Sequence, residues 1–275
     1  MSQLTTFQVG GPARLLLEPL DPESAAETVR RVRQRGLPVR VLGNGSNLLV
    51  SDAGVEGAVI FTDRMRRCIQ DEDRIRAWAG THLVGLVNYA AKVGLSGVEG
   101  LIGIPAQVGG AVRMNAGGRW GEIFDVLESV TVCDLETGEV RTLTRSECQP
   151  TYRNSNLGNV MVLECVLRLK PGDRKAIAEA TKEHLLEKNA VQPVTEPSAG
   201  CIFKNPKPDS AGKVIESCGL KGTRIGGIEV SPKHANYFVN VGGGTCDDAL
   251  RLIELVRDRV RRERGIELQL EVQLW

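Results

Sequence analysis

The segment from Gly97 to Gly121 contains eight glycines and still keeps apolar residues throughout its length. A flexible linker would lack these apolar side chains, so the segment is expected to be buried. Glycine has no Cβ and lets main-chain N–H groups approach a ligand closely and form an anion-binding concavity. The segment therefore predicts a site for a phosphate-bearing cofactor. Tight turns of a β-rich domain are the alternative. The apolar residues are Leu101, Ile102, Ile104, Val108, Ala111, Val112 and Met114.

Another glycine-rich turn comes earlier in the chain, between two short β-like runs at residues 39–50. We call the turn at residues 43–47 the first glycine segment and residues 97–121 the second glycine segment. The turn is not a Rossmann fingerprint, because the residues after it predict a strand and another turn rather than a helix. Nor is it a P-loop, because no Gly-Lys-Ser or Gly-Lys-Thr follows. Phosphate would be held by turn N–H groups, the Ser46 hydroxyl and the side-chain amides of Asn44 and Asn47.

The composition indicates a globular protein of about two domains: 275 residues, 41% hydrophobic and 25% charged. Lys and Arg number 35 against 34 Asp and Glu, so no basic excess is present to bind nucleic acid. The basic run from Arg257 to Arg264 is interspersed with acidic residues and predicts a solvated helix face. We find no membrane-length apolar run and no signal-peptide pattern, and we expect a cytoplasmic protein without membrane association.

Seven cysteines are scattered along the chain without a Cys-x-x-Cys pair or a histidine at ligand spacing. The pattern predicts neither disulfides nor a metal site. Most of the cysteines are expected to be small buried residues, and Cys201 is the exception because it lies in a turn of small residues.

The fold class expected from the local pattern is α+β. Helices are predicted between Asp21 and Gly36, between Thr81 and Gly94, from Asp173 through Leu186, and between Thr245 and Gly265. Strands are predicted at residues 55–61, 126–134, 139–143, 160–169, 227–230, 237–241 and 268–274. The domain boundary is expected at Pro171-Gly172. A cofactor module would cover residues 1–171, with subdomains of about 1–51 and 52–171, and a smaller α+β substrate domain would cover 172–275.

Chemistry-bearing residues gather in the second half of the chain. The turn from Pro197 to Pro206 contains the Cys201 thiol, followed by Lys204 and Asn205. Downstream, residues 231–236 add cations and amides that suit a phosphorylated ligand. Upstream, the Arg153 guanidinium could bind a carboxylate.

In this order of motifs the chain resembles the UDP-N-acetylenolpyruvoylglucosamine reductase family nearly end to end. The opening motif at residues 6–13 and the two glycine segments match the family's first motifs. The later motifs follow in the same order: Tyr152-Arg153-Asn154-Ser155, Gly200 to Pro206, Lys233-His234-Ala235-Asn236 and Leu268 to Val272. The chain is similar to the compact type of this family, which lacks an insertion carrying a Tyr lid.

The resemblance implies an FAD-binding module of the vanillyl-alcohol oxidase or p-cresol methylhydroxylase type, followed by the substrate domain. NADPH would reduce FAD, and a hydride would then pass to the vinyl carbon of an enolpyruvyl ether of UDP-N-acetylglucosamine. Cys201 would protonate the neighbouring carbon, while Arg153 and Glu271 would hold the substrate carboxylate. Many relatives carry serine in place of Cys201. A thiol with a pKa of about 8.5 releases a proton more readily than an alcohol.

The resemblance also implies which residues contact the ligands, with the C-terminal strand at about 266–275 returning toward the active site. We expect a monomer that binds FAD, NADPH and a UDP-sugar. The expected FAD-binding residues are Gly43, Asn44, Gly45, Ser46, Asn47, Gly103, Ile104, Gly109, Gly110, Ala111, Asn115 and Ala116. The expected substrate-binding residues are Tyr152, Lys204, Asn205, Lys213, Lys233 and His234.

One departure from the family pattern concerns Ala106, where many relatives carry glycine, so that position is expected to need no positive φ. Three other functions remain open. One is an FAD-dependent sugar or hydroxy-acid oxidase of the same fold, and a second is a cysteine hydrolase that uses Cys201 and His234. The third is a non-catalytic sugar-nucleotide binder.

Overall fold

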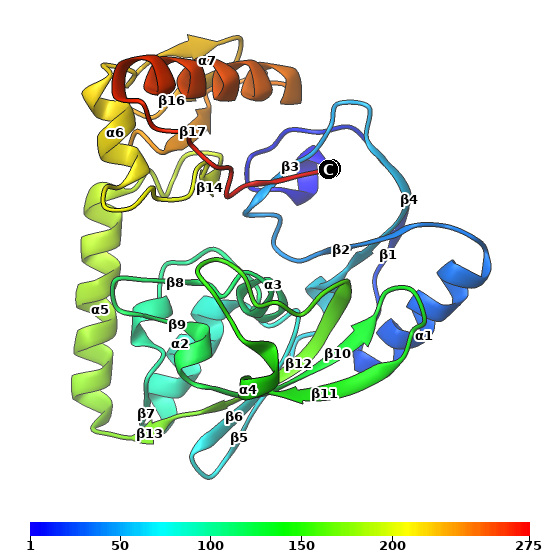
Figure 1. The fold of residues 1–275 in the computed structure, drawn as a ribbon. Helices are drawn as coiled ribbons and strands as arrows, with labels where there is room; N and C mark the ends of the chain where they lie inside the picture. The colour runs from blue at the N-terminus through cyan, green and yellow to red at the C-terminus, as the bar shows by residue number, and fades with distance from the viewer. The chain divides into compact units, whose positions relative to one another are not determined.

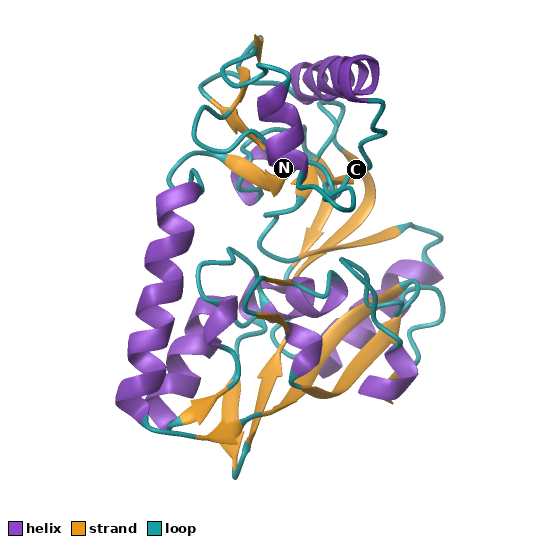
Figure 2. Cartoon of the chain, turned by 60° about the vertical axis from the view of Figure 1, so that its left-hand side comes forward, coloured by secondary structure: helices purple, strands orange, loops and turns teal.

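The computed structural model describes residues 1–275 as two compact units, each with its own hydrophobic core (Figure 1). The terminal unit consists of Met1–Arg14, Gly45–Glu56 and Asn189–Trp275, and the central unit of Leu15–Asn44 and Gly57–Lys188. Both units combine helices with a mainly antiparallel sheet, which confirms the α+β class (Figure 2). No helix is both long and apolar enough to span a membrane.

This division differs from the predicted boundary at Pro171-Gly172. Helix α5 (Arg174–Val191) contributes Ile177, Leu185 and Lys188 to the central unit, so that unit ends within α5. The N-terminal residues and the segment Gly45–Glu56 pack with the C-terminal part of the chain instead. The prediction assumed that each domain is continuous in sequence, and the terminal unit is assembled from three separate segments.

The central unit is built on a five-stranded antiparallel sheet with the order β11-β10-β12-β6-β5. Strands β1 (Ala13–Leu17) and β4 (Val55–Phe61) cross the division between the units, and β4 pairs in parallel with β2. The elements within the central unit are α1 (Pro22–Gln34), α2 (Leu83–Val93), α3 (Val108–Arg113), α4 (Arg145–Cys148), β2 (Val39–Leu42), β5 (Cys68–Asp71), β6 (Arg74–Trp78), β7 (Leu95–Ser96), β8 (Gly117–Gly118), β9 (Gly121–Glu122), β10 (Leu127–Asp134), β11 (Val140–Thr144), β12 (Val160–Arg168), β13 (Lys170–Pro171) and 3-10 turns at Thr62–Arg64, Glu99–Leu101 and Ile123–Asp125.

The central strand β12 is apolar on both faces because helices cover both faces. Val160 and Val162 belong to the core that contains α2 and α3, whereas Met161 and Leu163 belong to the core that contains α1. Successive side chains of a strand point to opposite faces, so one continuous apolar run serves both layers. The central unit is therefore a three-layer arrangement, with α2 and α3 on one face of the sheet and α1 on the other.

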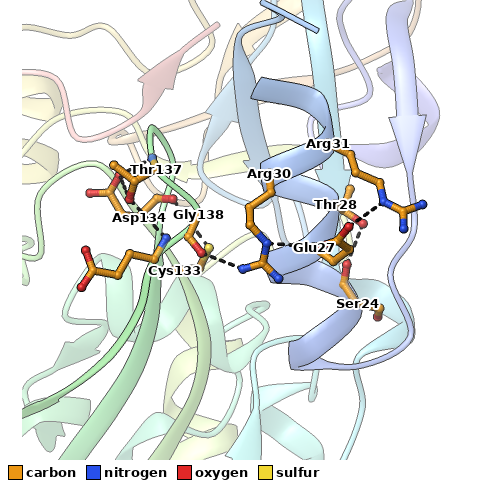
Figure 3. A network of polar contacts seen from close by, with 10 residues as sticks. Ser24, Glu27, Thr28, Arg30, Arg31, Cys133, Asp134, Thr137 and Gly138 are labelled. Atoms are coloured by element: carbon orange, nitrogen blue, oxygen red, sulfur yellow. Dashed lines mark hydrogen bonds and ion pairs between the residues drawn. The ribbon is translucent and has the colours of Figure 1, made fainter. Parts of the chain in front are cut away.

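Helix α1 is anchored to the turn between β10 and β11. The Arg30 guanidinium donates to the Gly138 carbonyl at 3.0 Å and to Glu27 at 3.0 Å (Figure 3). The turn itself is closed by Asp134, whose carboxylate accepts from the amides of Glu136 and Thr137. These amide bonds hold the pKa of Asp134 below its usual value.

The terminal unit contains a four-stranded antiparallel sheet with the order β14-β17-β16-β15. Its core joins Phe7 near the N-terminus to Phe203, Phe238 and the buried face of α7. The chain ends on a parallel pair in which Gln273 and Leu274 lie beside Leu48 and Leu49. The elements are β3 (Leu48–Leu49), β14 (Ser198–Cys201), α6 (Ala211–Ser217), β15 (Arg224–Ile225), β16 (Ile228–Val230), β17 (Tyr237–Asn240), α7 (Cys246–Arg264), β18 (Gln273–Leu274) and a 3-10 turn at Ser2–Leu4.

The four predicted helices are confirmed as α1, α2, α5 and α7, and six of the seven predicted strands as β4, β10, β11, β12, β16 and β17. The strand predicted at 268–274 is wrong over most of its length. Only Gln273–Leu274 forms a strand, together with a single bridge between Leu270 and Phe203. The helices α3 and α6 and the β5–β6 hairpin were not predicted.

The N-terminus of α7 depends on a side chain from a distant segment. The Asp52 carboxylate accepts from the backbone amides of Cys246 at 2.9 Å and Asp247 at 3.1 Å. These are two of the four amides that an α-helix leaves without an internal partner, and an anion is favoured at this end. Asp52 therefore links the segment after β3 to the longest helix of the terminal unit.

We expect Asp52→Ala to lower the free energy of unfolding by about 1–2 kcal/mol, because both amides lose their acceptor. Asp52→Asn keeps one acceptor oxygen and should lose about half as much. Urea denaturation of the three proteins measures the difference. An Asp52→Ala protein as stable as the wild type would show that water replaces the cap at no cost.

Candidate functional site

The two glycine-rich segments meet in the central unit. The side-chain amide of Asn44 donates to the Pro105 carbonyl at 2.7 Å. A Cβ added at Gly43 would lie 3.4 Å from Oε1 of Gln107, so the first turn passes close to the second segment. The amide of Asn44 was expected to donate to phosphate, and one of its two N–H groups joins the two segments.

Gln107, in the middle of the second segment, is buried directly before α3. Its Oε1 accepts from Thr62 Oγ1 at 2.6 Å, and its Nε2 donates to Asp63 Oδ1 at 2.9 Å. The residues that follow form helix α3 rather than the predicted turn. Because α3 begins at Val108, Gly109 and Gly110 lie in the first turn of a helix.

Gly109 is required by packing. Its amide donates to the Ala79 carbonyl at 2.8 Å, and a Cβ at this position would lie 2.9 Å from Cβ of Ala79. The backbone amide of Gly109 therefore already has an acceptor. Gly110, in contrast, is exposed, and a Cβ added there would meet no protein atom within 4 Å. The close approach of α3 to residue 79 leaves Gly110 facing open space.

The backbone before α3 changes direction at Gly103, where φ is +74°. Ala106 is not among the residues with positive φ, which confirms the expectation that this position tolerates a Cβ. The Ala106 carbonyl accepts from the amide of Leu83, and this bond ties the loop to the start of α2. Ile104 and Ala116 are half-buried against the central core, where Ala111 is fully buried.

Asn115 carries an unsatisfied polar atom. Its side chain is 2% exposed, its φ is +43°, and its Nδ2 donates to Glu122 at 2.6 Å and to the Thr151 carbonyl at 3.2 Å. Its Oδ1 is buried without a hydrogen-bond partner. A buried acceptor without a donor is costly, and a ligand N–H would satisfy it. Together with the open face at Gly110, this acceptor fits a flavin, whose ring offers such a donor.

Tyr152 and Arg153 form the tip of a tight turn in the same unit. Thr151 and Asn154 exchange two backbone hydrogen bonds, and Arg153 has a φ of +57°. Left-handed backbone at a residue with a Cβ costs about 1 kcal/mol and is typical of functional sites. The guanidinium carbon of Arg153 lies 4.8 Å from the centre of the Tyr152 ring. Because the Thr151 carbonyl accepts from Asn115, the turn is linked to the second glycine segment.

The terminal unit carries the other candidate residues around Cys201, which is half-buried at the end of β14 opposite Tyr237. The backbone after it is held on two sides. The Ile202 amide donates to the Asn236 carbonyl at 2.9 Å, and the Ile202 carbonyl accepts from the amide of Glu271 at 2.8 Å. Glu271 is thus paired with Ile202, the residue that directly follows Cys201.

The side chain of Asn236 strengthens this arrangement. It is 1% exposed, and it accepts from the Phe203 amide at 3.0 Å and donates to the Phe203 carbonyl at 2.8 Å. The side-chain amide thereby pairs with the backbone as a neighbouring strand would. Asn236 was part of a sequence motif but was not predicted as a site residue.

The first glycine segment continues into the terminal unit at Gly45 and reaches the same place. Asn47 Nδ2 donates to the Glu271 carbonyl at 3.2 Å, and a Cβ at Gly200 would lie 3.7 Å from the Ser46 carbonyl oxygen. The Asn47 amide was expected to bind phosphate, and one of its two N–H groups bonds to the backbone of Glu271. Gly45 is buried, and its carbonyl accepts from the amide of Thr6 at 3.3 Å.

The predicted substrate-binding residues of the terminal unit differ in how many partners they already have. Asn205 Oδ1 accepts from the Ala211 amide at 3.0 Å, and Lys233 Nζ donates to the Asn189 carbonyl at 2.6 Å. Lys204 is half-buried and Lys213 exposed, and neither forms an ion pair within residues 1–275. The ammonium groups of these two lysines therefore have no carboxylate partner in the structure.

His234 is half-buried, and its surroundings favour the neutral form of its imidazole. Its Nδ1 accepts from the Asn236 amide at 3.2 Å, and its ring meets Tyr237 edge-on at 4.9 Å. Burial lowers the pKa of His234, and the nearby Lys221 adds to this effect. The imidazole thus presents an N–H at Nε2 rather than a charge.

Sequence reasoning missed three residues that shape the site: Gln107, Asn236 and Lys188. Gln107 is a lone polar residue within an apolar, glycine-rich stretch, and Asn236 ends a motif, so both gave a usable signal. Lys188 gave none, because it lies on a helix rich in charged residues and looks solvent-exposed. In the structure its side chain is 8% exposed.

Comparison with known proteins gives matches over the whole chain. A family model described as "UDP-N-acetylenolpyruvoylglucosamine reductase, C-terminal domain" matches residues 192–275, and one described as "FAD binding domain" matches residues 13–144. The UDP-N-acetylenolpyruvoylglucosamine reductase of Moorella thermoacetica is 44% identical over 276 residues, which cover 100% of this chain and 91% of that protein. The reductase of Heliobacterium modesticaldum is 43% identical, with 100% and 88% covered.

Among solved structures, the crystal structure of UDP-N-acetylenolpyruvylglucosamine reductase from Thermus caldophilus is similar to this chain with a TM-score of 0.85 and 41% identity. The match covers 100% of this chain and 96% of that one. It extends the similarity from sequence to fold along the entire chain, and it supports the FAD-binding module expected from the sequence.

We expect His234 to titrate below its ordinary pKa of about 6.5, as NMR of the imidazole will measure. Well above pH 6.5 both folded and unfolded states hold a neutral ring, and the contribution to stability is complete. As the pH falls below 6.5, the unfolded chain takes up the proton first and stability is lost. The wild type should therefore lose more unfolding free energy between pH 7.5 and 5.5 than His234→Asn. Equal losses would contradict this assignment.

Proposed function

Because the chain belongs to the UDP-N-acetylenolpyruvoylglucosamine reductase family, we propose that Cys201, Arg153 and Glu271 carry out the reaction of that family in it. The protein is an FAD-dependent oxidoreductase that uses NADPH to reduce the enolpyruvyl ether of UDP-N-acetylglucosamine to UDP-N-acetylmuramate, a peptidoglycan precursor. We further propose that it acts in the cytoplasm as a monomer. Family membership favours this activity over an oxidase, a cysteine hydrolase or a binding protein.

The observation that supports the assignment of roles is the backbone pairing around Ile202, in which Glu271 bonds to the residue directly after Cys201. The residues that would hold FAD are those of the two glycine segments, together with Asn115 and its unsatisfied Oδ1. When bound, FAD supplies the two-electron chemistry that connects NADPH to the vinyl group of the substrate.

Cys201 is proposed as the acid. Delivery of a hydride equivalent to the terminal vinyl carbon leaves an electron pair on the carbon next to the substrate carboxylate. The Sγ–H bond of Cys201 breaks, its proton forms the new C–H bond at that carbon, and the thiolate is reprotonated from water. A thiol with a pKa of about 8.5 is protonated at neutral pH and still gives up its proton readily.

Arg153 and Glu271 are proposed to act on the substrate carboxylate. The Arg153 guanidinium is a fixed positive charge that can bind both carboxylate oxygens and stabilise the charge that develops beside them. Its left-handed backbone and its packing on Tyr152 limit the orientations available to it. The backbone of Glu271 bonds to Ile202 and Asn47, and its side chain would help to hold the substrate carboxylate and stabilise its enolate-like form.

Lys204 and Lys213 are proposed to meet the diphosphate of the UDP-sugar, because neither has an acidic partner in the structure. His234 would add a neutral N–H donor. Tyr152, Asn205 and Lys233 remain proposed substrate contacts, with the side chains of Asn205 and Lys233 also serving backbone partners.

Anaerobic mixing separates the two half-reactions and tests the role of Cys201. NADPH should bleach the flavin of the wild type and of Cys201→Ala at the same rate. Addition of the enolpyruvyl substrate should then restore the colour about 10²–10⁴ times more slowly in Cys201→Ala, because the acid is missing. Cys201→Ser should retain substantial turnover.

The control is Cys218→Ala, which removes a buried thiol from the core of the same unit. It should reoxidise at the wild-type rate. Reoxidation of Cys201→Ala at that rate would remove Cys201 from the mechanism, and a wild type whose colour never returns would contradict the proposed reaction as a whole.

A further inference from the structure

Lys188, near the end of α5, is a buried cation that the proposed reaction does not use. Its Nζ donates to the carbonyl of Gly100 at 2.9 Å and to that of Ile102 at 2.5 Å. The ring centre of Trp120 lies 5.5 Å from the same atom. Lys188 forms no ion pair with a carboxylate within residues 1–275, so two carbonyl dipoles and one aromatic face are all that balance its charge.

An unpaired buried cation is unfavourable for folding, and an apolar residue of similar size would be cheaper to bury. Burial lowers the pKa of Lys188 from 10.5 to about 8, which reflects this cost. Stability alone therefore does not explain a lysine at this position. The explanation has to come from the two carbonyls that it holds.

Gly100 and Ile102 lie at the end of the 3-10 turn Glu99–Leu101, directly before the second glycine segment changes direction. Carbonyls at the end of a helical turn lack internal partners and carry partial negative charge. The Lys188 ammonium group donates to the carbonyls of both Gly100 and Ile102 and fixes the turn. Three residues after Ile102, the Pro105 carbonyl accepts from Asn44, so the loop is held at both ends.

Helix α5 also limits the space available to the loop. A Cβ at Gly103 would lie 3.1 Å from Cδ1 of Leu185 and 3.4 Å from Cδ of Lys188. Trp120 covers the ammonium group and stacks on His184 with ring centres 4.5 Å apart. The position of Gly103 and Ile104 is therefore set by one turn of α5 and by the Lys188 charge.

We propose that Lys188 is a positioning residue of the cofactor loop, which holds Gly100 and Ile102 so that Gly103 and Ile104 are placed to receive FAD. This inference rests on the proposed function, in which the second glycine segment holds FAD. In this proposal Lys188 increases the affinity for FAD. The same residue lowers the stability of the FAD-free protein, because its charge is buried without a carboxylate partner.

The test measures FAD affinity and the stability of the FAD-free protein in the same set of variants. In K188M the two carbonyls lose their donor, and the dissociation constant of FAD should rise about tenfold or more. The melting temperature of FAD-free K188M should be unchanged or higher, because a near-isosteric apolar side chain replaces a buried cation. K188R, whose guanidinium can donate to both carbonyls, should recover part of the affinity.

The matched control is K182M, which removes an exposed lysine from the same helix and should leave both quantities at the wild-type value. FAD affinity of K188M within twofold of the wild type would overturn the proposal. A lower melting temperature with unchanged affinity would overturn it too, because it would make Lys188 a purely structural residue. So would a K188M chain that fails to fold even with FAD. A wild type that binds no FAD would instead contradict the proposed function.

Discussion

A buried loop rich in glycine has few side chains of its own to satisfy its backbone, so its carbonyl and amide groups need partners from elsewhere. The rest of the central unit is arranged around this constraint. Asn44 supplies a donor to Pro105, the Leu83 amide supplies one to Ala106, and Lys188 supplies donors to Gly100 and Ile102. These partners come from the first glycine turn, from the start of α2 and from α5. Each end of the loop is bonded to a separate element, and these bonds restrict the positions that the loop can take.

The same principle operates in the terminal unit, where the backbone pairs Glu271 with the residue that follows Cys201. Ile202 bonds to Asn236 on one side and to Glu271 on the other, while Asn47 bonds to the carbonyl of Glu271. Neither Cys201 nor Glu271 depends on a long flexible side chain for its place. Proton transfer and charge stabilisation require positions accurate to a fraction of an ångström, and strand-like backbone pairing provides this accuracy.

The sequence predicted the helices whose first and last residues are marked by capping residues next to them in the chain. The helices α1 and α7 begin with capping boxes at Asp21 and Thr245, and α2 and α7 end at left-handed glycines, all of which are visible in sequence.

Contacts between distant residues were not visible. The division of the chain was missed because the terminal unit joins three segments, and the strand at 268–274 was overextended because only its last residues find a partner in β3. The side chains of Asn44 and Asn47 were expected to bind phosphate, and a sequence cannot show that each also donates to a carbonyl 61 or 224 residues away. Lys188 looked exposed for the same reason, since its partners lie more than 80 residues away.

The central claim is that the two glycine segments, joined by Asn44 and Pro105, form one cofactor site. Amide hydrogen exchange of the protein with and without FAD tests it most directly, with peptides covering residues 43–48 and 101–112 as the readout. FAD should slow exchange in both peptides over the same range of concentration, while α7 at residues 246–264 exchanges as before. Protection of one glycine segment without the other would contradict the claim.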